Sequence, residues 1–165
     1  MKNKYFFGLL LLTLACTIAS AQSLVGYTWD TYKIKFKISS DMNEVVNNAD
    51  KFEVSSHNIT MDIYPRKGEN LTYSGMKSAI VAWAGQESLS YSARNINGDD
   101  QPIYLKDLNG YWGCAIDGTK GSSSATMLLL VDPDYPEISF YVWVAYNDGY
   151  YQDALQIIKS FQPMR

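Results

Sequence analysis

The stretch TMLLLVDPDYPEISFYVWVAY, residues 126–146, decides the fold of this chain. Its two outer parts, 126–131 and 140–146, are apolar at almost every position rather than at alternate positions. A strand that is covered on both faces has such a run, whereas a strand with one wet face alternates between polar and apolar residues. We therefore predict two central strands, joined by a reversal at the Asp- and Pro-rich segment 132–136.

Turn signals upstream extend these two strands into a longer meander. Asn-Gly pairs at 97–98 and 109–110 accept the positive φ that a two-residue type I′ hairpin turn needs. The Asp-Gly pair at 117–118 marks a further predicted reversal. The interval 89–147 is thus predicted to hold five short strands that run up and down.

Two further strand regions precede the meander. Residues 32–38 alternate between lysine and aromatic or aliphatic residues, so we predict a strand with one buried and one solvated face. Its lysines suit an anion-binding row, but their simpler role is to keep the strand from pairing with another chain. Residues 52–54 and 59–63 alternate again, which predicts a hairpin or a bent pair of strands.

Apolar residues at helical spacing predict three helices outside the meander, at 41–49, at about residues 72–84 and at about residues 149–161. These helices are the elements that can cover the two faces of the sheet. The expected fold class is therefore α+β. We expect an antiparallel sheet with a C-terminal five-strand meander, covered by helices on both faces as in an α/β/α sandwich.

The composition is that of a folded globular protein. The 165 residues are 47% hydrophobic and 19% charged. This length suits one domain, and we predict a single globular α+β domain over residues 22–165 because the sequence shows no linker or internal repeat there. The formal net charge of −3, without any block of like charge, argues against nucleic acid as a partner.

The N-terminus has the pattern of a secretory signal peptide. Lys2 and Lys4 precede an apolar run at 5–15, and Ala-Ser-Ala at 19–21 has the small residues of a cleavage site. We therefore predict that residues 1–21 are a signal peptide and that the mature protein is periplasmic or secreted. The apolar run is too short for a comfortable bilayer span, and we expect no transmembrane segment in the mature chain.

Cys16 offers an alternative interpretation, in which it carries a lipid anchor. A lipoprotein signal places a leucine-like residue three positions before the lipidated cysteine, and Thr13 stands there instead. Cleavage after Ala21 would remove Cys16 and leave Cys114 as the one thiol. An intramolecular disulfide is then excluded, although the predicted compartment is oxidising.

Groups that catalyse reactions are scarce in this sequence. His57 is the single histidine, and Cys114 lies in an apolar run, where a thiol packs as a small hydrophobic side chain. A hydrolase-type enzyme that uses His57 or Cys114 is the enzymatic alternative. The sequence has no Gly-x-Ser-x-Gly elbow, no phosphate-binding glycine loop and no dinucleotide fingerprint. We therefore predict no catalytic residues and no cofactor.

Two acidic clusters lie in predicted turns. Asp99 and Asp100 follow the first Asn-Gly pair, and Asp132, Asp134 and Glu137 surround the proline-rich reversal. Neither cluster has the spaced oxygen ligands of a dedicated calcium loop, and one histidine with one cysteine is too few for zinc. We predict no metal site, and the sequence leaves a weak one at the second cluster open.

Aromatic residues are the remaining sign of a binding site. Several lie near the ends of predicted elements: Tyr27, Trp29, Tyr111, Trp112, Tyr150 and Tyr151. Exposed aromatic clusters bind sugars, peptides or partner proteins, whereas buried ones pack the core. Trp29, Tyr111 and Trp112 are the candidate ligand-binding residues.

Three segments in a fixed order support a resemblance to a known family. They are YKIKFKIS at 32–39, ITMDIYP at 59–65 before the middle helix, and ALQIIKSF at 154–161 in the closing helix. With the strand hairpin before the closing helix, this order resembles the PsbP-like fold. That fold is named for an extrinsic subunit of photosystem II and is shared with a Ran-binding nuclear import factor and small exported bacterial lipoproteins.

The resemblance implies an antiparallel sheet with helices on both faces and a role in binding or assembly rather than catalysis. It brings no functional residues to this chain. We therefore expect a non-catalytic exported bacterial domain that binds a protein partner, such as an envelope protein, or a small ligand. The alternatives are the hydrolase-type enzyme and a structural subunit of an envelope assembly.

Overall fold

The computed structural model describes residues 23–165, so the predicted signal peptide at 1–21 and the alternative lipid site Cys16 lie outside the described residues. The elements follow in the order β1 (Leu24–Trp29), β2 (Ile34–Ser39), β3 (Asn43–Asn47), β4 (Phe52–Ser55), β5 (Ile59–Lys67), the 3₁₀ turn η1 (Tyr73–Gly75), α1 (Met76–Gln86), β6 (Ile103–Leu108), β7 (Tyr111–Lys120), β8 (Ser123–Val131), β9 (Ile138–Tyr146), α2 (Tyr151–Lys159) and β10 (Gln162–Pro163).

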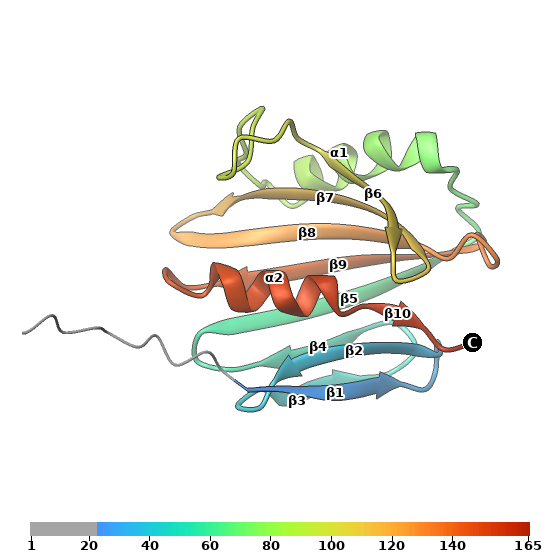
Figure 1. Ribbon diagram of the computed structural model, residues 1–165, viewed down its shortest axis with the longest axis horizontal. Helices are drawn as coiled ribbons and strands as arrows, with labels where there is room; N and C mark the ends of the chain where they lie inside the picture. The colour runs from blue at the N-terminus through green and yellow to red at the C-terminus, as the bar shows by residue number, and fades with distance from the viewer. Residues whose placement is uncertain (1–22) are drawn as a thin grey trace, which may run out of the picture.

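The strands form a large and a small antiparallel sheet (Figure 1). The large sheet has seven strands in the order β3-β4-β5-β9-β8-β7-β6, and the small sheet has three in the order β1-β2-β10. β8 and β9 lie inside the large sheet, and all but a few of their residues are buried. The prediction that the two apolar runs form central strands is therefore confirmed.

Each face of the large sheet has its own cover and its own hydrophobic core. On one face α1 packs on β7 and β8, and Met76, Ile80 and Trp83 join side chains of β7, β8 and β9 in one buried cluster. On the other face α2 and the small sheet pack together, so that Phe36 and Phe161 join one buried cluster. The fold is α+β with helices on both faces of an antiparallel sheet, as predicted.

The helix predicted at 41–49 is wrong, because β3 occupies most of this interval. β3 pairs with β4, and the register shifts between Glu44 and Val46. Such a bulge adds one residue to a strand and breaks its alternation, so the apolar residues fall at a helix-like spacing. Val45 is 57% exposed, which shows that the apolar residues do not face one core.

The predicted meander contains four strands rather than five. Residues 89–102 form an irregular segment that touches β7 through an isolated bridge between Ser90 and Thr119. The chain does reverse at 109–110, where Asn109 and Gly110 have φ of 53° and 103°, as a type I′ turn requires.

The reversal predicted at 117–118 is wrong, because both residues lie within β7. The chain reverses at 121–122 instead, where Gly121 has φ of 64° and Lys120 pairs with Ser123. The predicted reversal at 132–136 does connect β8 to β9. Within residues 23–165, neither helix is long and apolar enough to cross a membrane.

Candidate functional site

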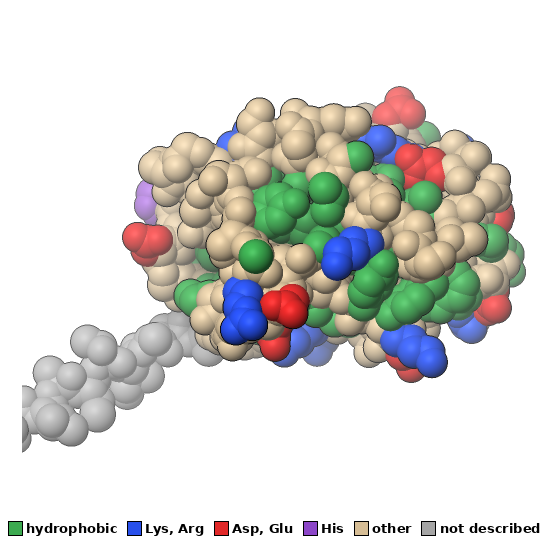
Figure 2. Space-filling model, turned by 90° about the horizontal axis from the view of Figure 1, so that it is seen from above, with side chains coloured by type: hydrophobic (Ala, Val, Ile, Leu, Met, Phe, Trp, Pro, Cys, Tyr) green, Lys and Arg blue, Asp and Glu red, His purple; other side chains and the backbone are tan. Residues whose placement is uncertain are grey.

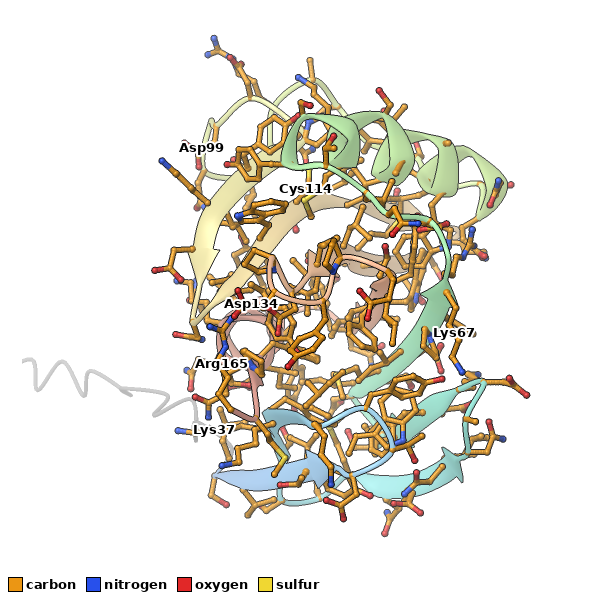
Figure 3. The ribbon with its side chains drawn as sticks, turned by 90° about the vertical axis from the view of Figure 1, so that its right-hand side faces the viewer. Lys37, Lys67, Asp99, Cys114, Asp134 and Arg165 are labelled. Carbon is orange, nitrogen blue, oxygen red and sulfur yellow. The ribbon has the colours of Figure 1, made fainter. Side chains whose placement is uncertain are left out.

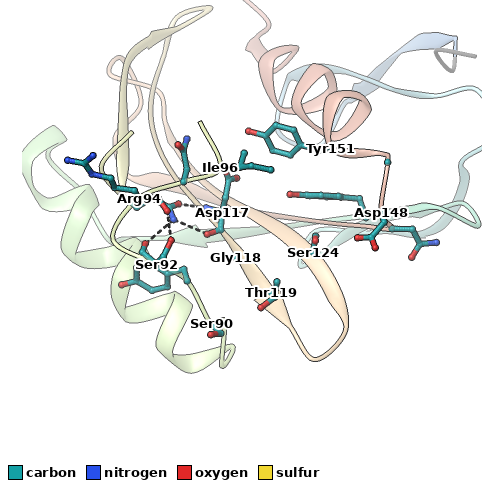
Figure 4. A pocket seen from close by; sticks show the side chains of 16 residues that line it. Ser90, Ser92, Arg94, Ile96, Asp117, Gly118, Thr119, Ser124, Asp148 and Tyr151 are labelled. Atoms are coloured by element: carbon teal, nitrogen blue, oxygen red, sulfur yellow. Dashed lines mark hydrogen bonds between the residues drawn. The ribbon is translucent and has the colours of Figure 1, made fainter. Parts of the chain in front are cut away.

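A cleft lies at the end of the large sheet where β7 ends, β8 begins and α2 starts (Figure 4). We call it the Asp117 cleft. It has a volume of about 370 Å³. It lies between residues 90–101 of the irregular segment, which we call segment 90–101, and the connection from β9 to α2. Its polar and aromatic lining includes Ser92, Gln101, Asp117, Ser124, Tyr146 and Tyr151.

Gly118 lets the segment 90–101 approach the sheet closely. A Cβ atom on Gly118 would lie 2.5 Å from the carbonyl oxygen of Ser90 and 2.9 Å from Cγ of Leu89. Ser90 donates its backbone N–H to the carbonyl of Thr119 at 2.9 Å, and Thr119 donates to Ser90 at 2.8 Å. A glycine inside a strand commonly marks such a close backbone approach.

Gln101 completes the attachment by bonding as a neighbouring strand would. Its Oε1 accepts the backbone N–H of Asp117 at 2.5 Å, and its Nε2 donates to the carbonyl of Asp117 at 3.0 Å and to that of Ser92 at 3.1 Å. The β6 pairing ends at Ala115, so this amide satisfies the next backbone groups along the edge of β7. The wall of the cleft is thereby held on the sheet.

The tip of the same segment reaches α2 on the other side of the cleft. Asn95 Oδ1 accepts the backbone N–H groups of Asn97 and Asp99 at 3.0 and 2.9 Å, which closes the tip on itself. Asn97 Nδ2 then donates to the hydroxyl of Tyr151 at 3.3 Å. The Asn-Gly signal at 97–98 thus belongs to a loop of the site, where Gly98 has φ of 87°, and does not join two strands.

Asp117 places a carboxylate at the floor of the cleft. Thr126, its neighbour across the β7–β8 pair, donates its hydroxyl to Oδ1 at 2.6 Å. Burial raises the pKa of Asp117, while the hydroxyls of Thr126 and Tyr151 lower it by a smaller amount. Such a desolvated carboxyl group in a concave site is a common sign of function.

Two tyrosines form the wall on the side of α2. The rings of Tyr146 and Tyr151 lie 5.9 Å apart and are tilted by 53°. Burial raises the pKa of both phenols, and the charge of Asp117 raises it further, so both stay protonated at neutral pH. Arg94 also lines the cleft, but its guanidinium pairs with Asp100 at 3.2 Å. An acceptor beside aromatic rings suits a ligand that presents hydroxyl or ammonium donors.

None of the three aromatic residues predicted as ligand-binding candidates lines this cleft. Trp29 is 1% exposed and packs against Tyr32 and Phe52 in the core beside α2. Tyr111 lies on the same face of the large sheet, in the wall of a second pocket, and is 2% exposed. The structure therefore does not combine these two with Trp112 in a single site.

Trp112 faces the other side of the sheet, where it belongs to an aromatic surface cluster. Its ring centroid lies 5.8 Å from that of Tyr73, which lies 5.0 Å from that of Tyr104 on β6. Hydrophobic side chains reach the surface on the side of α1 and β6, and Val81 and Tyr104 are each 38% exposed there (Figure 2).

His57 and Cys114 do not meet. His57 is exposed in the turn between β4 and β5, while Cys114 is fully buried under α1. β5 and β7 are separated by β9 and β8, which at about 4.8 Å per strand spacing places them roughly 14 Å apart. Burial raises the pKa of the Cys114 thiol to about 11. This geometry does not support a Cys–His catalytic pair.

The two acidic clusters find partners within the chain. Asp132 and Asp134 both bind the guanidinium of Arg165, at 3.1 and 2.7 Å. Asp100 pairs with Arg94, and Asp99 Oδ2 accepts from Asn95 Nδ2 at 3.4 Å. Across residues 23–165, no three His, Cys, Asp or Glu side chains group closely enough to hold a metal ion.

Most residues of the cleft have no distinguishing pattern in the sequence. The Asp-Gly pair predicts a turn at Asp117, and nothing in the sequence distinguishes Gln101 or Tyr146, although Tyr151 is among the aromatic residues at element ends. The sequence does hold one signal for the cleft, the glycine at position 118 in the strand β7. A glycine inside a strand can mark the close approach of another segment. The pairing of that strand with segment 90–101 depends on tertiary structure.

Comparisons with known proteins find similar structures only. No protein-family model and no curated protein sequence matches the chain. The cyanobacterial PsbP protein CyanoP from Synechocystis sp. PCC 6803 is similar with a TM-score of 0.56 at 9% identity, over 90% of this chain and 97% of that chain. The Ran-binding protein Mog1p of Saccharomyces cerevisiae is similar with a TM-score of 0.51 at 2% identity, over 87% of this chain and 97% of that chain.

A protein of Bacteroides thetaiotaomicron also matches, with a TM-score of 0.47 at 12% identity over 88% of this chain, which spans 49% of that chain. The likenesses to CyanoP and Mog1p show that this chain has the PsbP-like fold, as its segment order predicts. At such low identity they concern the fold and not the site.

Proposed function

We propose that this protein is a non-catalytic, exported bacterial binding protein and that the Asp117 cleft holds its ligand. The observation that carries the proposal is the desolvated carboxylate of Asp117 at the floor of a concave site with aromatic walls. The ligand is a small polar molecule that presents hydroxyl or ammonium groups, because Asp117 accepts hydrogen bonds and favours positive charge.

A binding role agrees better than catalysis with the lining of the cleft. Its side chains include no histidine, lysine or cysteine that could serve as a base or nucleophile beside Asp117. The nearest hydroxyl, that of Thr126, already donates its proton to the carboxylate. The same fold carries a binding role in Mog1p, which is described as Ran-binding. The signal-peptide pattern at 1–21 supports export.

A titration with defined probes tests the proposal. The amide signals of ¹⁵N-labelled protein are followed in NMR spectra while ethanolamine, D-glucose or sodium acetate is added. We expect ethanolamine, D-glucose or both to shift the signals of Ile96, Gly118 and Gly149, which line the cleft. Acetate, an anion without donors, should leave them in place because Asp117 repels it.

Asp117→Asn is the test variant, and Asp30→Asn is its control. Both remove one carboxylate charge, but Asp30 is exposed in the turn between β1 and β2. We expect Asp117→Asn to weaken probe binding about tenfold or more, as hydrogen bonds to charged groups contribute about 1.5–3 kcal/mol. Asp30→Asn should bind as the wild type does. Equal weakening by both variants, or shifts with acetate alone, contradicts the proposal.

A further inference from the structure

A second pocket lies at the opposite end of β9, beside the connection from β8. It has a volume of about 480 Å³ and is lined by this connection, by the turn between β1 and β2, and by the residues that follow α2. It shares no lining residue with the Asp117 cleft. We call it the Arg165 pocket, after the side chain that already lies in it.

Arg165 binds two carboxylates of this pocket through both of its terminal nitrogens. Nη2 lies 3.1 Å from Oδ1 of Asp132, and Nη1 lies 2.7 Å from Oδ2 of Asp134 (Figure 3). Asp132 is 7% exposed, and its Oδ1 also accepts the backbone N–H of Asp134 at 3.0 Å. The two acceptors are therefore held at a spacing that fits the planar fork of a guanidinium group.

The guanidinium of Arg165 lies where solvent and a competing cation can reach it. The side chains of Arg165 and Asp134 are 52% and 59% exposed, and an ion pair between such groups contributes little stability because water competes for both partners. The remaining contact of Arg165, from Nη2 to the carbonyl of Gly110, is long at 3.5 Å. A buried carboxylate with one exposed, weakly held partner can accept another group of the same shape.

The other walls of the pocket are aromatic and acidic. Tyr32, Tyr111, Tyr135 and Phe140 line it. Aromatic faces attract guanidinium groups, and Lys67 Nζ already lies 5.7 Å from the ring centroid of Tyr32. Glu137 adds a third carboxylate, while Lys33 is the lining cation besides Arg165. With Arg165 displaced, the three carboxylates still outnumber Lys33 in the lining and Lys67 beside Tyr32, so the pocket favours a cation.

We infer that the Arg165 pocket is a second binding site, which accepts the guanidinium group of a ligand in place of Arg165. Asp132 and Asp134 receive the ligand's N–H groups, and the tyrosines cover its apolar part. Arg165 acts as an internal competitor that fills the acidic end of the pocket when no ligand is bound. This site does not depend on the function proposed for the Asp117 cleft.

Calorimetric titration with methylguanidinium chloride tests this inference. Arg165→Ala removes the competitor, so we expect it to bind methylguanidinium about three- to tenfold more tightly than the wild type. Asp132→Asn in the Arg165→Ala background should weaken that binding about tenfold or more. Methylammonium, which has the charge without the planar fork, should bind less tightly than methylguanidinium. Acetyl-arginine amide distinguishes two kinds of ligand, an arginine side chain in a peptide and a small guanidinium compound. A site for an arginine side chain should bind acetyl-arginine amide more tightly than methylguanidinium.

Controls keep the result interpretable. Asp107→Asn changes the same kind of charge on β6 outside the pocket and should leave binding unchanged in the Arg165→Ala background. Arg165→Lys leaves a weaker competitor that lacks the planar fork, so it should bind methylguanidinium more tightly than the wild type but less tightly than Arg165→Ala, and its NMR spectrum serves as a check on folding. The inference is wrong if Arg165→Ala has a native NMR spectrum but binds methylguanidinium no more tightly than the wild type. It is also wrong if adding Asp132→Asn to Arg165→Ala leaves methylguanidinium binding unchanged.

Discussion

Asp117 links ligand binding to the pH dependence of stability. Because burial raises its pKa in the folded state, ionisation of Asp117 costs folding free energy. Its stabilising contribution is fully present below the unfolded-state pKa of about 3.9 and is lost as pH rises through the folded-state pKa. We predict that Asp117→Asn raises the free energy of unfolding at pH 7, and that this gain shrinks as the pH is lowered toward 3.

Urea unfolding of the wild type and of Asp117→Asn at several pH values measures this difference in the free energy of unfolding. The amide of asparagine can still accept the hydroxyl of Thr126, so packing in the cleft is retained. Asp30→Asn should show no comparable gain at pH 7. A variant that is less stable than the wild type at pH 7 would mean that the ionised carboxylate is well satisfied in the folded protein. Residues that bind ligands often lower stability in this way.

Cys114 illustrates the opposite case, a reactive residue type without a functional setting. The thiol is fully buried against α1, and burial raises its pKa to about 11. In the Cys16→Ser variant, which leaves one cysteine, we predict that Ellman's reagent reacts with native Cys114 at pH 8 at least about a hundredfold more slowly than with the unfolded chain. The same assay in guanidinium chloride gives the control rate for the unfolded chain. Fast reaction of the native protein would support the enzymatic interpretation instead.

Gly118 decides how closely the segment 90–101 packs on β7. The obstacle to a side chain there is the backbone oxygen of Ser90, 2.5 Å from an ideal Cβ, which cannot move without breaking the bridge to Thr119. We predict that Gly118→Ala lowers the free energy of unfolding by about 1–3 kcal/mol. Hydrogen exchange should rise at Ser90 and Thr119, whose amides form the bridge.

Gly26→Ala is the matched control for this prediction. Gly26 also lies in a strand, β1, but nothing lies within 4 Å of the position of its Cβ. Its substitution should change stability by about 0.5 kcal/mol or less. If Gly118→Ala behaves in the same way, the attachment of segment 90–101 is looser than the contact distances indicate.

The elements that the sequence predicted correctly are those with an undisturbed period or a strong turn signal. β8 and β9 have continuous apolar runs, β2 alternates throughout, and the turn at 109–110 has the residues that its backbone needs. Residues 41–49 misled the prediction because the bulge at Glu44 and Val46 imitates helical spacing. β1 was not predicted because Gly26 and Thr28 leave its alternation weak.

The candidate site was less predictable than the fold, because its parts are far apart in the sequence. Gln101 acts as a strand partner for Asp117, and no local pattern distinguishes its side-chain amide from that of any other glutamine. Thr126 and Asp117 become neighbours only through the β7–β8 register. Aromatic residues at element ends proved too general a criterion, since Trp29 is buried in the core.

For the whole molecule, the aromatic core joins the small sheet to the large one. Phe52 on β4 is fully buried, and its ring centroid lies 4.9–5.6 Å from those of Tyr27, Trp29 and Phe36 on the small sheet. We predict that Phe52→Ala costs about 3–5 kcal/mol and that both sheets still unfold in one transition. Urea unfolding followed by circular dichroism and by tryptophan fluorescence measures both quantities. Tyr135→Ala, at a site 62% exposed, is the control, and separate transitions would mean that the sheets are independent.

The described contacts begin just after the predicted signal-peptide cleavage site. β1 begins at Leu24, and the carbonyl of Ser23 accepts the backbone N–H of Ser40 at 2.9 Å, so cleavage after Ala21 would leave every described contact in place. When the full chain is expressed in a bacterial host, we predict a soluble periplasmic product whose intact mass corresponds to residues 22–165. Cys16→Ser should not change this mass, because the predicted cut removes that residue. A product that begins at a lipidated Cys16 and is lost in Cys16→Ser would show instead that the protein is anchored to a membrane, because its lipid chain would bury itself in the bilayer.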